Sequence, residues 1–526
     1  MKASRKHLSA KGLFRSIYDQ FKKIKAPTSS SPAGRPEKIK LTDCLMSGLA
    51  LFSLKFSSLL NFDERKNEDR IKNNLRTLFH VNQTPSDTYM RECLDEVDPA
   101  QLRKTYKMLF AHAQKGKLLE EYEYLDNHYL IAGDGTGFFS SDKVHCDNCC
   151  IKTYGKCRIK LLSIAPSNFS RFKKNTYILF KKPEQHWELY FINSDKEIMK
   201  IEIWAIEGLQ ELLAGKIKKQ LSKAEKEIIK NQISAYYQSH YPNQKETYYH
   251  NMFCAAIVHP DKKTVIPFMP EPIIKTDGSK KNDCERNASK RLYSDLRREH
   301  PHLKLIVVED AIASNVPHLK ELNVLNLRYI IGVKSGDHKS LFELLQKTEC
   351  NEYQHQTENG VSHRYRYVNN VPLNDSHPDF KVNFIEYWEI KKNGEAQHFS
   401  WITDFTINDG NAYQIMKGGR CNWKIENETF NTLKNQGYHF SHNFGHGYKH
   451  LCNVFGMLMM LAFFVDQLQQ ACCHLFQKAR NKFHSKRSLW EEIRCLFFKY
   501  LIETWDDLFH SIINGHDDIV LKPNTS

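Results

Sequence analysis

Apolar residues recur at two different periods along this 526-residue chain. From 42 to about 119 they follow helical spacing, with helix-start signals at Asp87 and Asp98. Farther along come short apolar runs bounded by turn residues, which are typical of strands buried in a sheet. These runs are YLIAGDG, NMFCAAIVHP, KTVIPFMP and LKLIVVED. The pattern predicts a helical N-terminal domain over 41–125, followed by an α/β core.

Two amphipathic helices are predicted between and after these strands. The segment 283–301 places Cys284 and three further apolar residues on one stripe opposite a basic face, and 313–325 follows the fourth strand. Three adjacent strands, a helix, a fourth strand and another helix are the element order of an RNase H-like fold. We therefore expect a mixed sheet flanked by helices, built first from 126–157 and 245–340.

A second group of strands precedes the last part of the chain. Residues 341–412 alternate in stretches such as RYRYVNNV, VNFIEYWEI and FSWITDF, which predict an inserted antiparallel β subdomain with its own sheet. A helix and a basic loop are expected over 413–450, and a helical C-terminal region over 451–526. The most apolar stretch, 454–465, is shorter than the ~20 residues that cross a membrane, so it predicts a buried helix and no membrane partner.

Two segments lie outside this plan. Residues 1–40 mix Lys and Arg with the turn-rich run APTSSSPAGRPEK and predict a basic, flexible arm. Residues 158–244 separate the first two core strands and include a segment typical of an exposed helix at 218–237. We interpret this insert either as a DNA-contacting accessory domain or as a tolerated surface insertion.

The overall charge indicates an anionic partner. With 76 Lys and Arg against 61 Asp and Glu, the formal charge is +15 and the pI about 9.0. This favours nucleic acid but does not separate DNA from RNA or an acidic membrane surface. Because the N-terminus lacks the continuous apolar core of a signal peptide, we expect a cytoplasmic, reducing location. In that location the 14 cysteines are interpreted as thiols or metal ligands.

Three acidic residues occur in settings that suit metal binding. Asp134 lies in AGDGTGFF, Asp310 ends LKLIVVED, and Glu426 lies on a helix in NWKIENETF. Brought together, two strand-end aspartates and a helical glutamate would form an oxygen-lined pocket for two hard cations, which assist phosphodiester cleavage. Each aspartate has an ordinary alternative, Asp134 as a turn residue before Gly135 and Asp310 as a helix cap. Glu428 competes with Glu426, since residues two apart cannot share a helical face.

These motifs occur together in one known family. The chain resembles the DDE transposases of bacterial insertion sequences, within the retroviral-integrase superfamily. The matching segments are DGTGFFSS, VHPDKKTVIPFMPEPI, NDCERNASKR, VVEDAIASNVPHL and WKIENETFNTLKNQGYHFSHNFGHG, in family order over roughly 40–470. The resemblance implies an RNase H-like core with a β-strand insertion, Mg²⁺ as cofactor with Mn²⁺ able to substitute, and Asp134, Asp310 and Glu426 as catalytic metal ligands.

The same resemblance implies a reaction and partners. It implies cleavage and strand transfer at the terminal inverted repeats of an insertion sequence, with double-stranded DNA as substrate and target. It also implies a homodimer in a synaptic complex and a bacterial, nucleoid-associated location.

Two positions depart from the family. In related enzymes a tyrosine, an arginine and a lysine accompany the glutamate at fixed spacing, with the arginine immediately before the tryptophan. This chain has Asn422 in place of the arginine and Gly419 three residues earlier. Arg420 is a candidate for the missing cation, because a guanidinium group suits phosphate oxygens. The alternative is a catalytically decayed protein that recognises transposon ends without cutting.

Four other residues are candidates for contact with DNA. Lys434, two turns along from Glu426, and Lys449, in the histidine-rich loop, are predicted to lie near DNA phosphates. In the insertion, Trp388 or Trp401 would hold a flipped base by stacking. The alternative for each tryptophan is a core aromatic of a half-buried sheet.

A cysteine-rich motif, HCDNCC, precedes the insert. It contains His145, Cys146, Cys149 and Cys150. A Cys-x-x-Cys pair with an adjacent histidine has the spacing of half a zinc site. His250 and Cys254 are candidates for the second half, and a cluster of reduced thiols is the alternative.

Overall fold

The computed structural model describes residues 5–25, 39–154, 157–182, 186–193, 195–214, 221–240, 245–275, 285–357, 360–515 and 522–523. The chain divides into two compact units. Unit 1 comprises 1–139, 145–150 and 249–526, and unit 2 comprises 140–144 and 151–248. The turn-rich run at 26–38 and Cys284 lie outside the described residues.

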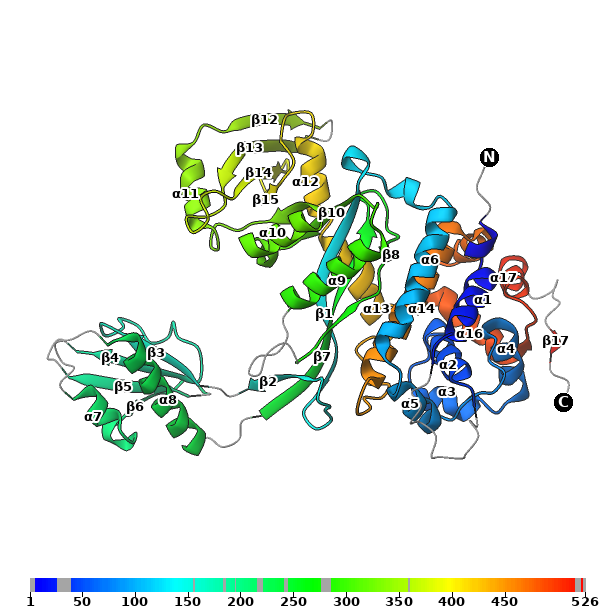
Figure 1. Cartoon of the computed structure of the whole chain (residues 1–526), viewed down its shortest axis with the longest axis horizontal. Coiled ribbons are helices and arrows are strands. Elements are labelled where there is room, and N and C mark those ends of the chain that lie inside the picture. Colours follow the sequence, from blue (N-terminus) through cyan, green and yellow to red (C-terminus); the bar gives the residue numbers. More distant parts are fainter. Residues whose placement is uncertain are drawn as a thin grey trace. The chain divides into compact units, whose positions relative to one another are not determined.

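Helices from the two ends of the chain pack together within unit 1 (Figure 1). The N-terminal ones are α1 (Ala10–Phe21), α2 (Leu41–Ser53), α3 (Leu59–Arg65), α4 (Asp69–Phe79), α5 (Asp87–Asp95) and α6 (Arg103–Lys115). The C-terminal ones are α14 (Leu451–Cys472), α15 (His474–Arg480), α16 (Lys486–Lys499) and α17 (Trp505–Asn514). Phe14 of α1 stacks on Trp505 of α17 with ring centroids 5.0 Å apart. The two helical regions that we expected as separate domains therefore share one core.

Part of the predicted basic arm is folded. Residues 10–21 form α1, and Leu13, Phe14, Ile17 and Phe21 on it are buried. Apolar residues three and four apart form a stripe, and the helices around α1 cover it. The expectation of a flexible arm over 1–40 is therefore wrong for these residues.

Helix α14 lies at the centre of this helical body. By length and composition α14 could cross a membrane, because an 18-residue window within it has a mean hydropathy of 1.7. All of that window is buried inside the protein. It contacts α2 and α5, and the hydroxyl of Tyr106 donates a hydrogen bond to the Met457 carbonyl at 2.6 Å. The predicted buried helix is confirmed.

Most strands of a large mixed sheet also belong to unit 1 (Figure 1). Its described strands run in the order β12-β13-β14-β15-β11-β10-β1-β7-β2, and β8 and β9 pair with β7. Strand β1 pairs in parallel with β10, and β10 with β11, whereas β8 and β9 are antiparallel to β7. The bounds are β1 (Tyr129–Ser141), β2 (Cys150–Tyr154), β7 (Lys245–Val258), β8 (Ile266–Pro267), β9 (Glu271–Ile273), β10 (Leu305–Glu309) and β11 (Arg328–Gly332).

Five further helices belong to this α/β region. They are α9 (Glu285–Glu299), α10 (Val316–Val324), α11 (Lys339–Lys347), α12 (Ala412–Arg420) and α13 (Asn431–Asn435). As the periodicity predicts, α9 buries Ala288, Leu292 and Leu296. Helix α10 contacts α9 and β11, and α12 contacts β10, β11 and β14. The predicted mixed sheet flanked by helices is therefore present.

The inserted strands extend the core sheet. They are β12 (Asn351–Gln356), β13 (Ser362–Pro372), β14 (Lys381–Ile390) and β15 (Ala396–Thr403), paired antiparallel in sequence order. Strand β15 also pairs antiparallel with β11, with Ile402 opposite Ile331. The expected separate sheet is thus wrong, because β11 offers a free edge that β15 completes with hydrogen bonds.

Unit 2 has its own sheet and core. Strands β3 (Arg158–Leu162), β4 (Thr176–Lys181), β5 (Trp187–Ile192) and β6 (Ile198–Ile201) lie in sequence order, with α7 (Leu209–Leu213) and α8 (Lys223–His240). Helix α8 buries Ile229, Ile233 and Tyr237 against Tyr177 and Phe191 of the sheet. The helix that we expected to be exposed therefore has one buried face.

Candidate active site

The two aspartates lie at matching positions on neighbouring parallel strands. Ala132 of β1 pairs with Val308 of β10, so Asp134 and Asp310 each follow the paired residue by two positions. Asp134 is half-buried within β1 and accepts a hydrogen bond from the Gly135 N–H at 2.7 Å. Asp310 is exposed and caps a short 3₁₀ turn. The register therefore brings both carboxylates to the same end of the sheet.

Glu426 comes to this end of the sheet on an unusual helical segment. It lies in η7 (Ile425–Phe430), a π-helical stretch that leads into α13. The pKa of Asp134 is raised to about 7, first by loss of hydration on burial and then by the negative charges of Glu285, Glu426 and Asp310. Four carboxylates thus act on one another here. Short π-helical segments are frequent at functional sites.

The structure separates the two candidate glutamates. The charge of Glu426 acts on Asp134, whereas that of Glu428 acts on Lys486, where it opposes the lowering of the lysine pKa by burial. Two residues along a helix reverse the direction of a side chain, so the pair faces different neighbours. Glu426 is therefore the glutamate whose charge reaches Asp134.

Glu285 is a fourth acid that sequence reasoning missed. It opens α9 and lies against Gly135, and its pKa is raised by loss of hydration and by the charges of Asp310 and Glu309. Glu285 and Asp310 also line one small cavity of about 30 Å³. The segment NDCERNASKR had been recognised, but only the fold places its glutamate beside β1.

Glu309, the neighbour of Asp310, has a different role. It is buried, and its carboxylate accepts hydrogen bonds from the Tyr293 hydroxyl at 2.8 Å and from His318 Nε2 at 2.7 Å. Burial opposes protonation of His318, but the charge and hydrogen bond of Glu309, together with the charge of Glu321, outweigh it and raise the pKa of the histidine. This buried pair fixes the end of β10 from which Asp310 projects.

A cavity of about 590 Å³ opens beside Asp310. Its lining includes Lys334, His398, Phe399, Trp401, Arg420, Asn422 and Trp423. Gly419 also lines it, and a Cβ there would lie 2.5 Å from Nε1 of Trp401, so a side chain as large as tyrosine does not fit. The Oδ1 of Asn422 is buried and has no hydrogen-bond partner among the described residues. Both departures from the family pattern thus line this cavity.

Two of the predicted DNA-binding cations are engaged within the protein. Arg420 donates a hydrogen bond to Glu389 at 2.7 Å, and Lys449 binds both carboxylate oxygens of Glu96, at 2.6 and 2.8 Å. Lys434 is exposed on α13. To contact phosphate, Arg420 would have to leave Glu389, and Lys449 would have to leave Glu96.

The two tryptophans of the insertion have different surroundings. Trp388 is half-buried, stacks on His398 with ring centroids 4.9 Å apart, and has Arg364 and Arg366 near its ring. Trp401 is buried and lines the cavity beside Asp310. Of the two tryptophans, only Trp401 lines the cavity that Asp310 also lines.

The donors available at the acidic site suit a hard cation. Asp134, Asp310 and Glu426 supply carboxylate oxygens, the ligands that Mg²⁺ prefers. The pKa of Asp134 is raised first by burial and then by the neighbouring negative charges, and a bound cation would oppose both effects. The residues present therefore fit the cofactor that the sequence motifs imply.

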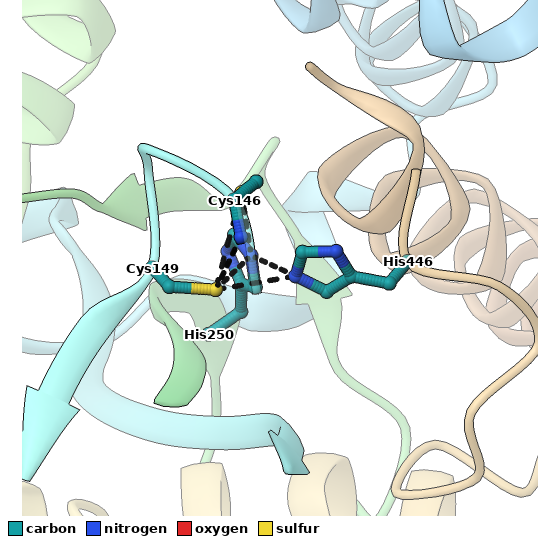
Figure 2. Close-up of side chains that lie close together, drawn as sticks. All are labelled: Cys146, Cys149, His250 and His446. Atoms are coloured by element: carbon teal, nitrogen blue, oxygen red, sulfur yellow. Dashed lines mark hydrogen bonds between the residues drawn. The ribbon is translucent and has the colours of Figure 1, made fainter. Parts of the chain in front are cut away.

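The Cys-x-x-Cys motif forms a different cluster from the one expected. Cys146 and Cys149 gather with His250 and His446 (Figure 2). His145 is exposed, and the thiol of Cys150 points to the Ile273 carbonyl at 3.5 Å. Cys254 is not part of the group either. His250 had been considered, but His446 lies 297 residues beyond Cys149, and no spacing rule selects it.

Comparison with known proteins adds little to this geometry. No protein-family model matches the chain, and no curated protein matches it. A solved structure that the chain resembles is the cryo-EM structure of the piggyBac transposase synaptic complex with hairpin DNA, at 10% sequence identity and a TM-score of 0.34. That similarity covers 93% of this chain and 85% of the other.

Proposed function

We propose that the chain is a DDE transposase with an RNase H-like core, which cleaves and joins DNA strands at the terminal inverted repeats of an insertion sequence. The observation that carries the proposal is the register of β1 and β10, which sets Asp134 and Asp310 side by side with the charge of Glu426 acting on Asp134. The strand order β8-β7-β1-β10-β11 supports the core assignment. The formal charge of +15 supports a nucleic-acid substrate.

The acidic residues would hold Mg²⁺ for this reaction. When bound, the metal supplies positive charge that activates the attacking oxygen and stabilises the leaving oxygen at phosphorus. Asp134, Asp310 and Glu426 would bind it, and Glu285 would add negative charge beside them. The cavity beside Asp310 has Trp401 and Trp423 in its lining, which suits a base extruded from the duplex and held by stacking.

A second candidate function is recognition of transposon ends without cleavage. Two observations favour it: Asn422 stands where the family has an arginine, and Arg420, the nearest replacement, is paired with Glu389. A protein of this kind would keep the fold and the basic surface, but it would not stabilise the charge that develops at phosphorus.

The test is cleavage of a labelled duplex that carries the inverted repeat flanking the gene, with Mg²⁺ and with EDTA. Wild type should cut at the repeat end only with Mg²⁺, and Asp310→Ala and Glu426→Ala should bind the duplex without cutting. Binding without cutting by all three proteins would indicate the second candidate. Absence of specific binding by folded wild type would refute both.

A further inference from the structure

Four potential ligand atoms converge in unit 1 away from the acidic residues. They are Sγ of Cys146 and Cys149 and Nε2 of His250 and His446, all within 4.8 Å of one another (Figure 2). The two sulfurs lie 3.9 Å apart and the two nitrogens 3.2 Å apart. The three sulfur–nitrogen distances recorded are 3.5, 3.3 and 3.2 Å.

These separations match the edges of a zinc tetrahedron. Zinc binds sulfur at about 2.3 Å and imidazole nitrogen at about 2.0–2.1 Å. Tetrahedral angles then place ligand atoms about 3.8 Å apart for two sulfurs, about 3.6 Å for sulfur and nitrogen, and about 3.3 Å for two nitrogens. Each recorded separation lies within about 0.4 Å of these values. We propose that Cys146, Cys149, His250 and His446 bind a structural zinc ion.

The protonation of His446 suits this role. Its Nδ1 lies 2.8 Å from the Gly447 carbonyl, which can only accept, so Nδ1 carries the proton and Nε2 presents its lone pair to the cluster. Nδ1 of His250 has no hydrogen-bond partner among the described residues. The direction of the His250 ring is therefore set by its position on β7. Both imidazoles therefore approach through Nε2, one of the two ring nitrogens that bind zinc.

The site is largely enclosed by protein. Cys149, His250 and His446 are buried, Cys146 is half-buried, and the rings of Phe138 and Phe139 pack beside the two imidazoles. With four protein ligands there is no open coordination position for water or substrate, which marks a structural rather than a catalytic zinc site. Two thiolates and two imidazoles also select zinc over Mg²⁺, which prefers oxygen ligands.

The segment that carries His446 is held in place by contacts outside the cluster. The carboxylate of Asp95 accepts hydrogen bonds from the backbone N–H groups of residues 448–451, at 2.8–3.0 Å. This fixes the start of α14 and, with it, the approach of His446. The ligand set is therefore arranged by the fold and does not depend on one flexible loop.

Zinc here would join three segments that are distant in sequence. Cys146 and Cys149 lie between β1 and β2, His250 lies on β7, and His446 lies between α13 and α14. Strand β1 carries Asp134, and η7 carries Glu426. His446 lies in the loop after α13, the helix that directly follows η7. The zinc would hold these two segments together, whether or not the chain cuts DNA.

Metal analysis of the purified full-length chain tests this proposal. Wild type should contain one zinc ion per chain after dialysis against metal-free buffer, and Cys149→Ser and His446→Asn should each lose it. His442→Asn, an exposed histidine in the same loop, and Cys495→Ser serve as matched controls and should retain the zinc. Zinc that is absent from wild type and not taken up on addition, or that persists in both ligand variants, would overturn the proposal. Iron in its place would also overturn it.

A ligand variant that fails to fold would lose zinc for a trivial reason, so the second measurement uses wild type alone. Blocking the thiols with a mercurial should release one zinc ion per chain, and exchange for Co²⁺ should give the absorption of a tetrahedral cobalt thiolate. Octahedral cobalt bands, or no zinc release on thiol blocking, would refute thiolate ligation. Neither readout depends on DNA cleavage, so failure of the proposed transposase activity would leave this result unaffected.

Discussion

The carboxylate of Glu285 lies over Gly135, the residue that follows Asp134. A Cβ at position 135 would come within 2.5 Å of Oε2 of Glu285. The absence of a side chain there lets the first turn of α9 bring a fourth negative charge onto β1. This contact links the helix to the site and explains why the pKa of Asp134 is raised by Glu285 more than by Asp310 or Glu426.

Removal of this fourth charge should weaken metal binding without abolishing it. We expect Glu285→Gln to lower the Mn²⁺ affinity of the acidic site about five- to thirtyfold, since one carboxylate charge near a cation in a solvated site is worth about 1–2 kcal/mol. Mn²⁺ binding followed by electron paramagnetic resonance measures this without DNA. Glu321→Gln, on the neighbouring helix α10 and paired with Lys290, is the control. Unchanged affinity in Glu285→Gln would show that its charge does not reach the metal.

The two glutamates of η7 should differ in their effect on cleavage. Glu426→Gln should reduce the cleavage rate about 10³-fold or more, because a lost metal ligand removes several kcal/mol of transition-state stabilisation. Glu428→Gln should stay within about threefold of wild type, since Glu428 faces Lys486. Single-turnover cleavage of a labelled repeat end measures both. A larger loss in Glu428→Gln would reverse the assignment.

Asp134→Ala should separate chemistry from folding. We expect it to keep the circular dichroism spectrum and DNA affinity of wild type while cleavage is lost, because Asp134 is only half-buried and its recorded hydrogen bond is to the adjacent N–H. Binding by fluorescence anisotropy and cleavage on the same duplex provide the comparison. A variant that does not fold would assign Asp134 a structural role instead.

Asp95→Asn should destabilise the protein. Burial alone would raise the pKa of Asp95, but four backbone N–H donors lower it below its usual value. The stabilisation from this carboxylate is therefore complete above its unfolded pKa of about 3.9 and is lost as pH falls through the lower folded pKa. We expect a loss of about 1–3 kcal/mol at pH 7.

Urea denaturation of wild type and Asp95→Asn from pH 7 to pH 3 measures this. The difference in unfolding free energy should stay constant down to about pH 4.5 and shrink only below that. Glu96→Gln, which removes only the exposed pair with Lys449, should cost less than about 1 kcal/mol. An equal cost for the two variants would contradict the role of the four backbone bonds.

His318→Gln should show the opposite dependence on pH. The charge of Glu309 raises the folded pKa of His318 above its unfolded value of about 6.5, so the stabilisation is complete below that value and is lost as pH rises through the folded pKa. We expect the variant to cost about 3–5 kcal/mol at pH 5.5, the range for breaking a buried pair, and less at pH 9. Denaturant unfolding at both values tests this, with exposed His302→Gln as control. A cost that is independent of pH would show that folding does not shift the pKa of His318.

Local sequence patterns were sufficient for many of the elements. Continuous apolar runs predicted the buried strands and the buried helix α14, and spacing of three and four residues predicted α9, because burial of an element requires apolar residues on the faces that it covers. Asp134 and Asp310 could be chosen because apolar runs end near them. Parallel neighbours with matched register then bring such ends together.

The tertiary structure decided what depends on contacts between distant segments. Glu285 joins the acids only because α9 packs beside β1, and His446 joins Cys149 across 297 positions. Helix α1 is buried because helices from both chain ends cover it, although its own segment has the composition of a basic arm. Sequence periodicity records which face of an element is apolar. It does not record which partner covers that face, since the partner is set by packing of the whole chain.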